Sequence, residues 1–187
     1  MSPAPSAYPE SSQVFVSYGC HSNDFLLVEY GFILPSERNR WDDVSVTSLV
    51  LPKLSPAHRG ILEEEGFLGD YHFDGSAFCF RTQAAARLLN IQNPRSAGMY
   101  RKLELWRRFI SGLDDGERDG PAVAEFLLSL LGRLQFAAEE ALEKIGALEN
   151  EQVVRVLTAR WEQILGMKTA VRRDILKGGG GDDREGD

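Results

Sequence analysis

Residues 121–176 read PAVAEFLLSLLGRLQFAAEEALEKIGALENEQVVRVLTARWEQILGMKTAVRRDIL, and this stretch decides the architecture of the second half of the chain. Apolar side chains recur at helical spacing in its first part: Phe126, Leu127, Leu130, Leu131, Leu134, Ala138, Leu142, Ile145 and Leu148. A second stripe follows: Val153, Val154, Leu157, Trp161, Ile164, Leu165, Val171 and Ile175. The polar residues 149–151 separate the two, so we predict two long antiparallel helices that bury their stripes against each other.

Residues 13–90 show a different pattern, of short strands and short helices. The expected strands are Gln13–Tyr18, a strand from Val44 toward Leu51 that Pro52 ends, and a hairpin of Tyr71–Phe73 and Phe78–Phe80 around Asp74-Gly75. The expected helices follow the N-cap residues Ser22, Ser55 and Thr82, with Gly31 and Gly66 ending the first two, and a further helix covers Met99–Ile110. We therefore predict an α+β fold whose second half is mainly helical.

The composition excludes several classes of protein. The 187 residues carry a net charge of −7 without a block of Lys and Arg, a poor match for nucleic acid. No apolar run reaches the roughly 20 residues that span a bilayer, so we expect no membrane partner either. Two cysteines, Cys20 and Cys79, are too few for a disulfide scaffold and favour an intracellular location, cytoplasmic or nuclear. His58 and His72 lack zinc-ligand spacing with Cys79, so we predict no metal site.

Residues 13–34, QVFVSYGCHSNDFLLVEYGFIL, carry a more specific signal. They resemble the C-terminal motif of the SET domain in the Rubisco large-subunit methyltransferase-like family, where a strand runs into YG, then SN, then a short helix ending in YGF. Residues 41–74, WDDVSVTSLVLPKLSPAHRGILEEEGFLGDYHFD, resemble that family's linker into its helical substrate-binding domain. RTQAAARLL and the two late helices resemble the domain itself. The resemblance implies the end of a SET domain at 13–40 and a substrate-binding domain at 41–176.

The resemblance also implies an activity and its residues. The family transfers a methyl group from S-adenosylmethionine to a protein side-chain nitrogen, usually that of lysine, so the partner is a protein substrate. By position, Tyr18 matches the catalytic tyrosine whose hydroxyl lies beside the departing methyl group. Tyr30 matches a residue near the channel for the target side chain. Phe32 matches an aromatic residue that packs against the adenine of the cofactor.

The chemistry of lysine methylation suits these residue types. A lysine ammonium has no lone pair, and forming the neutral amine at pH 7 costs about 4.6 kcal/mol from its reference pKa of about 10.4. Aromatic channel walls lower that cost by desolvating the charge. A tyrosine hydroxyl, with a reference pKa of about 10, stays protonated and orients the amine rather than acting as a strong base.

The resemblance does not extend to the whole family pattern. The family's SET domain begins with a glycine-containing cofactor loop and carries an Asn-His motif upstream of the segment that matches residues 13–34, whereas here residues 1–12 read as a disordered leader and no Asn-His pair occurs. We therefore expect a chain that holds one wall of the active site and is inactive alone, as a short gene model, a truncated paralogue or a cloned C-terminal piece would be. Residues 177–187, KGGGGDDREGD, read as a disordered tail.

Alternatives remain for each feature. The chain could be a non-catalytic protein-binding module that retains the substrate-binding domain. Tyr18, Tyr30 and Phe32 could be ordinary core aromatics. The strand at 13–18 would be an open edge that invites a partner to cover it. Basic residues on the 99–110 helix could meet an acidic protein or simply face solvent: Arg101, Lys102, Arg107 and Arg108.

Overall fold

The computed structural model describes residues 19–178. In this part of the chain the helices are α1 (Asn23–Tyr30), α2 (Thr47–Val50), α3 (Pro56–Glu64), α4 (Phe80–Leu89), α5 (Tyr100–Ile110), α6 (Gly120–Gly146) and α7 (Glu151–Gly178). Two strands, β1 (Val44–Ser45) and β2 (His72–Phe73), form an antiparallel sheet, and 3-10 turns cover Leu51–Lys53, Ala97–Met99 and Glu117–Asp119. The predicted α+β class, mostly helical, is confirmed.

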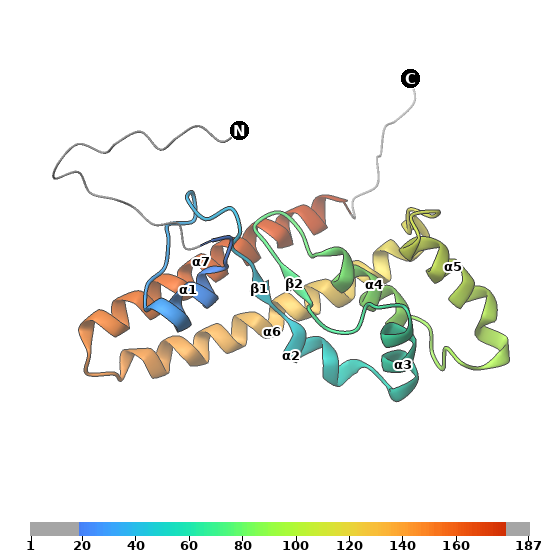
Figure 1. Cartoon of the computed structure of the whole chain (residues 1–187), viewed down its shortest axis with the longest axis horizontal. Coiled ribbons are helices and arrows are strands. Elements are labelled where there is room, and N and C mark those ends of the chain that lie inside the picture. The colour runs from blue at the N-terminus through green and yellow to red at the C-terminus, as the bar shows by residue number, and fades with distance from the viewer. Residues whose placement is uncertain (1–18, 179–187) are drawn as a thin grey trace, which may run out of the picture.

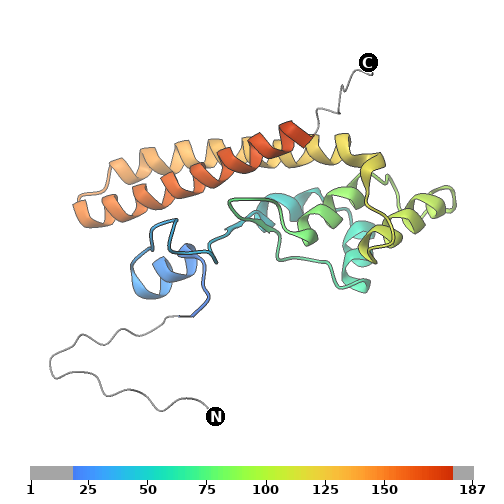
Figure 2. The same cartoon turned by 90° about the horizontal axis from the view of Figure 1, so that it is seen from above.

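Helices α6 and α7 form the predicted antiparallel hairpin, which runs along the longest axis of the molecule (Figure 1). Asn150 forms the turn, because its Oδ1 accepts hydrogen bonds from the N–H groups of Gln152 and Val153. The two helices bury their facing stripes, with Leu130 and Val171 almost fully inaccessible to solvent. Burial of apolar surface stabilises the pair by about 25 cal/mol per Å². Figure 2 shows the hairpin as one layer with the remaining elements on one side of it.

The small elements pack into a shared core beneath one half of the hairpin. β1 and β2 pair in the register Val44↔Phe73 and Ser45↔His72. Tyr71 and Phe73 are fully buried there, and α2 and α4 contact α6. The core therefore joins residues before 90 to the long hairpin, in one contiguous cluster.

The four residues predicted to begin or end α1 and α3 are confirmed. Ser22 accepts a hydrogen bond from the N–H of Phe25, and Gly31 ends α1 with a φ of 76°. Ser55 forms a capping box with His58, and Pro56 occupies the first turn of α3. Gly66 follows α3 with a φ of 77°, a conformation that glycine adopts without strain.

The strand predicted from Val44 toward Leu51 is wrong beyond Ser45. At Val46 the chain leaves the extended conformation and begins α2. The N–H of Val46 donates to the carbonyl of Tyr71 at 2.8 Å, and the Thr47 hydroxyl donates to the same oxygen at 3.2 Å. These bonds end the sheet, and Val46 and Val50 then point into the core one helical turn apart.

The hairpin predicted around Asp74-Gly75 is formed only in part. Phe73 and Phe78 make a single antiparallel bridge, while the main partner of β2 is β1. The N-cap predicted at Thr82 is wrong, because α4 begins at Phe80 with Cys79 as its N-cap. The hydroxyl of Thr82 instead accepts the N–H of His72 at 3.1 Å, a bond that ties α4 to β2.

One segment, Glu117–Gly146, is long and apolar enough to cross a membrane by length and composition, with a mean hydropathy of 1.2. A core helix passes the same test. Here the apolar stripe of α6 is buried against α7, while Arg133, Glu139 and Glu140 are exposed on it. We interpret this segment as a core helix.

The predicted strand Gln13–Tyr18, the leader at 1–12 and residues 179–187 lie outside the described part of the chain. α7 continues to Gly178, so Lys177 and Gly178, which were predicted to begin a disordered tail, are helical.

Candidate functional site

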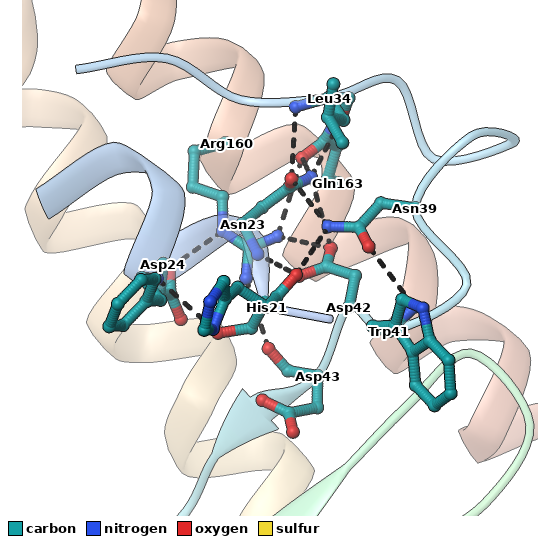
Figure 3. A network of polar contacts seen from close by, with 12 residues as sticks. His21, Asn23, Asp24, Leu34, Asn39, Trp41, Asp42, Asp43, Arg160 and Gln163 are labelled. Carbon is teal, nitrogen blue, oxygen red and sulfur yellow. Dashed lines mark hydrogen bonds and ion pairs between the residues drawn. The ribbon is translucent and has the colours of Figure 1, made fainter. Parts of the chain in front are cut away.

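The segment that resembles a SET-domain motif folds over residues 21–34 as a turn, the helix α1 and an extended exit. It lies beside α7, near the end where α6 and α7 are joined (Figures 1 and 2). The segment carries few buried apolar side chains, with Leu26 the one fully apolar buried residue of α1. Polar contacts to α7 and to residues 39–43 take the place of a hydrophobic interface, and Figure 3 shows them together.

Asn23 is the centre of these contacts and is fully buried. Its backbone N–H donates to Oδ1 of Asp42 at 2.8 Å, and its side-chain Nδ2 donates to the carbonyl of Leu34 at 2.8 Å and to Oε1 of Gln163 at 2.9 Å. Its Oδ1 accepts the N–H of Leu34 at 3.0 Å and Nδ2 of Asn39 at 2.9 Å. This amide thus holds the two ends of the motif segment together, because Asn23 is the first residue of α1 and its side chain bonds Leu34 beyond the end of the helix.

Arg160 connects this centre to the long hairpin. Its side chain is 3% exposed and projects from α7. Nε donates to Oδ1 of Asp24 at 2.7 Å, Nη1 donates to Oδ2 of Asp42 at 2.6 Å, and Nη2 donates to the carbonyl of Asp43 at 3.2 Å. Pairing of its donors offsets the cost of burying the guanidinium, and through these bonds Arg160 ties α1 to α7.

Two further amides complete the network. Nε2 of Gln163 donates to the carbonyl of Leu34 at 2.9 Å. Nδ2 of Asn39 also donates to the carbonyl of His21 at 3.0 Å, and its Oδ1 accepts the N–H of Trp41 at 3.2 Å. Residues 34–41, which connect α1 to β1, are therefore held at both ends by side chains of the same network (Figure 3).

The surroundings shift the pKa values of two charged groups in the network, Arg160 and Asp43. Burial lowers the pKa of Arg160, but the hydrogen bonds and charges of Asp24 and Asp42 raise it more, so the guanidinium remains charged. Burial raises the pKa of Asp43, and the charges of Asp42 and Asp24 act in the same direction against the opposing His72 and Arg160. The ionised form of Asp43 is therefore disfavoured, mainly by burial.

Of the three predicted site residues, Tyr30 and Phe32 lie in the described part of the chain and are close together, with ring centroids 6.3 Å apart. Phe25 extends this group, since its ring makes an edge contact with Tyr30 at 6.3 Å and stacks on His21 at 4.1 Å. Tyr30 is 50% exposed, and Phe32 is partly buried. Tyr18 lies outside the described residues, so its catalytic role stays a prediction. Among residues 19–178 no group of three His, Cys, Asp or Glu side chains could hold a metal ion.

Sequence reasoning missed the residues that hold the site together: Asn23, Asp42, Arg160 and Gln163. One signal was available. Arg160 falls three residues after Leu157 and four before Ile164, on the apolar face of α7. A charged residue at a core position requires a buried partner, and here the partners lie more than 100 residues away in the sequence.

The described residues form a mainly helical domain preceded by a segment that resembles a SET-domain motif, which is the arrangement expected for the C-terminal region of a SET-type lysine methyltransferase. The model of the family described as "Ribosomal lysine N-methyltransferase 2 C-terminal domain" matches residues 42–173, and the chain belongs to this family. No solved structure matches the chain.

Three curated relatives extend this finding. The chain is 28% identical over 147 residues to ribosomal lysine N-methyltransferase set11 of Schizosaccharomyces pombe, covering 78% of this chain and 38% of the relative. It is 24% identical over 172 residues to ribosomal lysine N-methyltransferase 2 of Saccharomyces cerevisiae, covering 88% and 34%. It is 32% identical over 127 residues to SET domain-containing protein 4 of Mus musculus, covering 63% and 27%. The chain thus matches roughly a third of the length of these relatives.

Proposed function

We propose that the chain is the C-terminal part of an S-adenosylmethionine-dependent protein-lysine N-methyltransferase of the Rubisco large-subunit methyltransferase-like type. In this proposal residues 13–40 end the catalytic domain and residues 41–176 form the domain that binds the substrate protein. The observation that carries it is the family match over residues 42–173, together with relatives whose names describe ribosomal lysine N-methyltransferases.

The aromatic group at the end of α1 supports the proposed site. Aromatic ring faces attract cations such as a sulfonium or a lysine ammonium, and they suit an adenine ring by stacking. Tyr30 and Phe32 supply two such rings close together. The methyl donor, when bound, supplies the electrophilic methyl group. The roles of the chain are to stack on the donor with Phe32, to line the lysine channel with Tyr30, and to orient the amine with the Tyr18 hydroxyl.

The polar network supports a defined relationship between the motif and the substrate domain. Asn23, Asp42 and Arg160 join the motif segment to α7 through short hydrogen bonds. Because α7 is one half of the long hairpin, a protein bound along the helical domain would be presented to the aromatic group in a fixed orientation. Correct orientation of two reactants is the main contribution of an enzyme to such a transfer.

The proposed site needs more protein than this chain provides. The three relatives are two to four times longer than the part that the chain matches. We infer that the enclosing residues of the methyl-donor site belong to that additional length and that the chain alone does not transfer methyl groups. The proposed substrate is a ribosomal protein, and the proposed location is intracellular, cytoplasmic or nuclear.

A chimera tests this function. The C-terminal region of S. pombe set11 that matches this chain is replaced by residues 13–178, and methylation of ribosomes is followed with labelled S-adenosylmethionine. Transfer to a lysine of a ribosomal protein is the expected result, with Tyr18→Phe reducing the rate of transfer and the solvent-facing Arg155→Met leaving it unchanged.

Calorimetry on the 187-residue chain gives the complementary measurement, and no heat with S-adenosylmethionine is expected. A folded chimera that binds the donor but methylates no ribosomal protein contradicts the proposed function. Binding of the 187-residue chain to ribosomal proteins in that case would favour the non-catalytic protein-binding module.

A further inference from the structure

A second feature lies at the opposite end of the molecule from the aromatic group. A cavity of about 260 Å³ opens between α4, α5 and residues 113–119. Its apolar walls come from Ile91, Leu105, Trp106 and Phe109, and its charged walls include Arg87, Lys102 and Arg118. In Figures 1 and 2 α5 is at the far end of the molecule from α1, so this cavity is separate from the proposed methyl-transfer site.

Arg87 is the unusual residue of this cavity. Its side chain is 10% exposed, and its Nε and Nη1 atoms are buried without a hydrogen-bond acceptor among residues 19–178. The nearest carboxylate is that of Asp119, with Oδ1 3.8 Å from Nη1, which is too long for a hydrogen bond. A buried donor left unpaired is unfavourable, so an acceptor that reached this guanidinium would recover part of that cost on binding.

The guanidinium is held in place by its neighbours. It lies over the ring of Phe109, with its Cζ 4.2 Å from the centroid. On Gly116, which has a φ of 74°, an added Cβ would lie 2.6 Å from both Nε and Nη2 of Arg87. The left-handed backbone at position 116 favours glycine, and a larger residue there would also displace the guanidinium. A guanidinium that is held in place and has unpaired N–H donors beside an apolar cavity can bind a carboxylate.

We propose that this cavity binds a single glutamate side chain, flanked by apolar residues, of a partner protein. The apolar walls accommodate the aliphatic stem of a glutamate and its neighbouring residue, and Lys102 and Arg118 add positive charge around the entrance. Asp114 and Asp119 also line the cavity and offset part of its positive charge, which suits one incoming carboxylate better than a row of phosphates. The carboxylate of Asp119 competes for the guanidinium of Arg87, and the incoming carboxylate displaces it.

The test uses the ¹⁵N-labelled 187-residue chain and two blocked tripeptides, acetyl-Leu-Glu-Leu-amide and acetyl-Leu-Gln-Leu-amide. The Nε–H resonance of Arg87 and the indole N–H resonance of Trp106 report on the cavity. Saturable shifts of both resonances with the glutamate peptide, and none with the glutamine peptide, are expected. Inorganic phosphate is titrated in parallel, and saturable shifts with phosphate alone would overturn the proposal in favour of a phosphate ligand.

Four variants test the assignment. Arg87→Met should weaken binding of the glutamate peptide about tenfold or more, as loss of 1.4 kcal/mol or more requires, while Arg101→Met on the exposed side of α5 should not change it. Asp119→Asn should strengthen binding several-fold, because it removes the competing carboxylate. If Arg87→Met does not fold, Arg87→Lys keeps the charge without the fork and should still bind more weakly. Equal shifts with both peptides, no shifts at all, or an affinity unchanged by Asp119→Asn would overturn the proposal.

Discussion

Nη1 of Arg160 lies 2.6 Å from Oδ2 of Asp42, and this ion pair joins two parts of the chain that are 118 residues apart in the sequence. Both side chains are almost completely buried, at 3% and 6% exposure. The pair therefore acts as the main polar connection between the long hairpin and the segment that precedes β1. Removing one partner would leave the other as an unpaired buried charge.

We expect Arg160→Met to lower the free energy of unfolding by about 3–5 kcal/mol, the usual cost of breaking a buried ion pair from one side. Urea unfolding followed by circular dichroism measures it. Arg155→Met, one to two turns earlier on the exposed side of α7, is the matched control and should change the unfolding free energy by less than about 0.5 kcal/mol. Equal stability of the two variants would show that the guanidinium is not needed.

Asn23→Asp should be strongly destabilising although it changes the shape of the side chain very little. The amide Nδ2 donates to Leu34 and Gln163, and an ionised carboxylate cannot donate. It would also place a negative charge beside Asp42. A loss of about 2–4 kcal/mol is expected from these unpaired groups. The same replacement at exposed Asn90 is the control, and a similar loss there would attribute the effect to charge alone.

Asp43→Asn should make the protein no less stable at pH 7, even though it removes a charge near Arg160. The folded-state pKa of Asp43 is raised above its ordinary value of 3.8, mainly by burial. Its stabilising contribution is therefore present below that value and is lost as the pH rises through the folded-state pKa. Unfolding midpoints between about pH 3 and pH 7 should depend less on pH in the variant. A clear loss of stability confined to pH 7 would contradict this sign.

Asp74→Ala should show the opposite dependence. Burial raises the pKa of Asp74, but hydrogen bonds from Ser76 and Ala77 outweigh it and hold the pKa below 3.8. The stabilisation is thus present above pH 3.8 and is lost as the pH falls through the lower folded-state value. Because Oδ1 of Asp74 accepts the N–H groups of both residues in the turn, a loss of about 1–2 kcal/mol is expected at pH 7. Thermal unfolding should show the difference from the wild type shrinking below about pH 3. A difference that stays constant with pH would mean that the turn does not depend on the ionised carboxylate.

The sequence predicted those parts of the fold that depend on local patterns. The stripes of α6 and α7 and the caps at Ser22 and Ser55 are properties of neighbouring residues, and they are confirmed. The strand beyond Ser45 and the N-cap at Thr82 were wrong because distant bonds, from Val46 and Thr47 to Tyr71 and from Thr82 to His72, decided the outcome. Local propensity is routinely overridden by such tertiary contacts.

In the candidate site, too, local features could be predicted from the sequence and distant contacts could not. The grouping of Tyr30 with Phe32 follows from their proximity in the sequence around the end of α1. The contacts of Asn23 and Arg160 could not be predicted, since the choice of partner for a buried polar group depends on the folded arrangement. The position of Arg160, a charged residue on the apolar face of α7, did indicate that it needs a buried partner.

Helix α7 extends well beyond the point at which Arg160 holds the motif segment. From Arg160 to the end of α7 at Gly178, at about 1.5 Å per residue, the helix advances about 27 Å. The motif segment lies at the first of these points, and the α4–α5 cavity lies toward the second. A single protein that offered a lysine at one and a glutamate at the other would have to reach along the hairpin from one site to the other. The hairpin would then select target proteins by the spacing between a lysine and a glutamate on their surface.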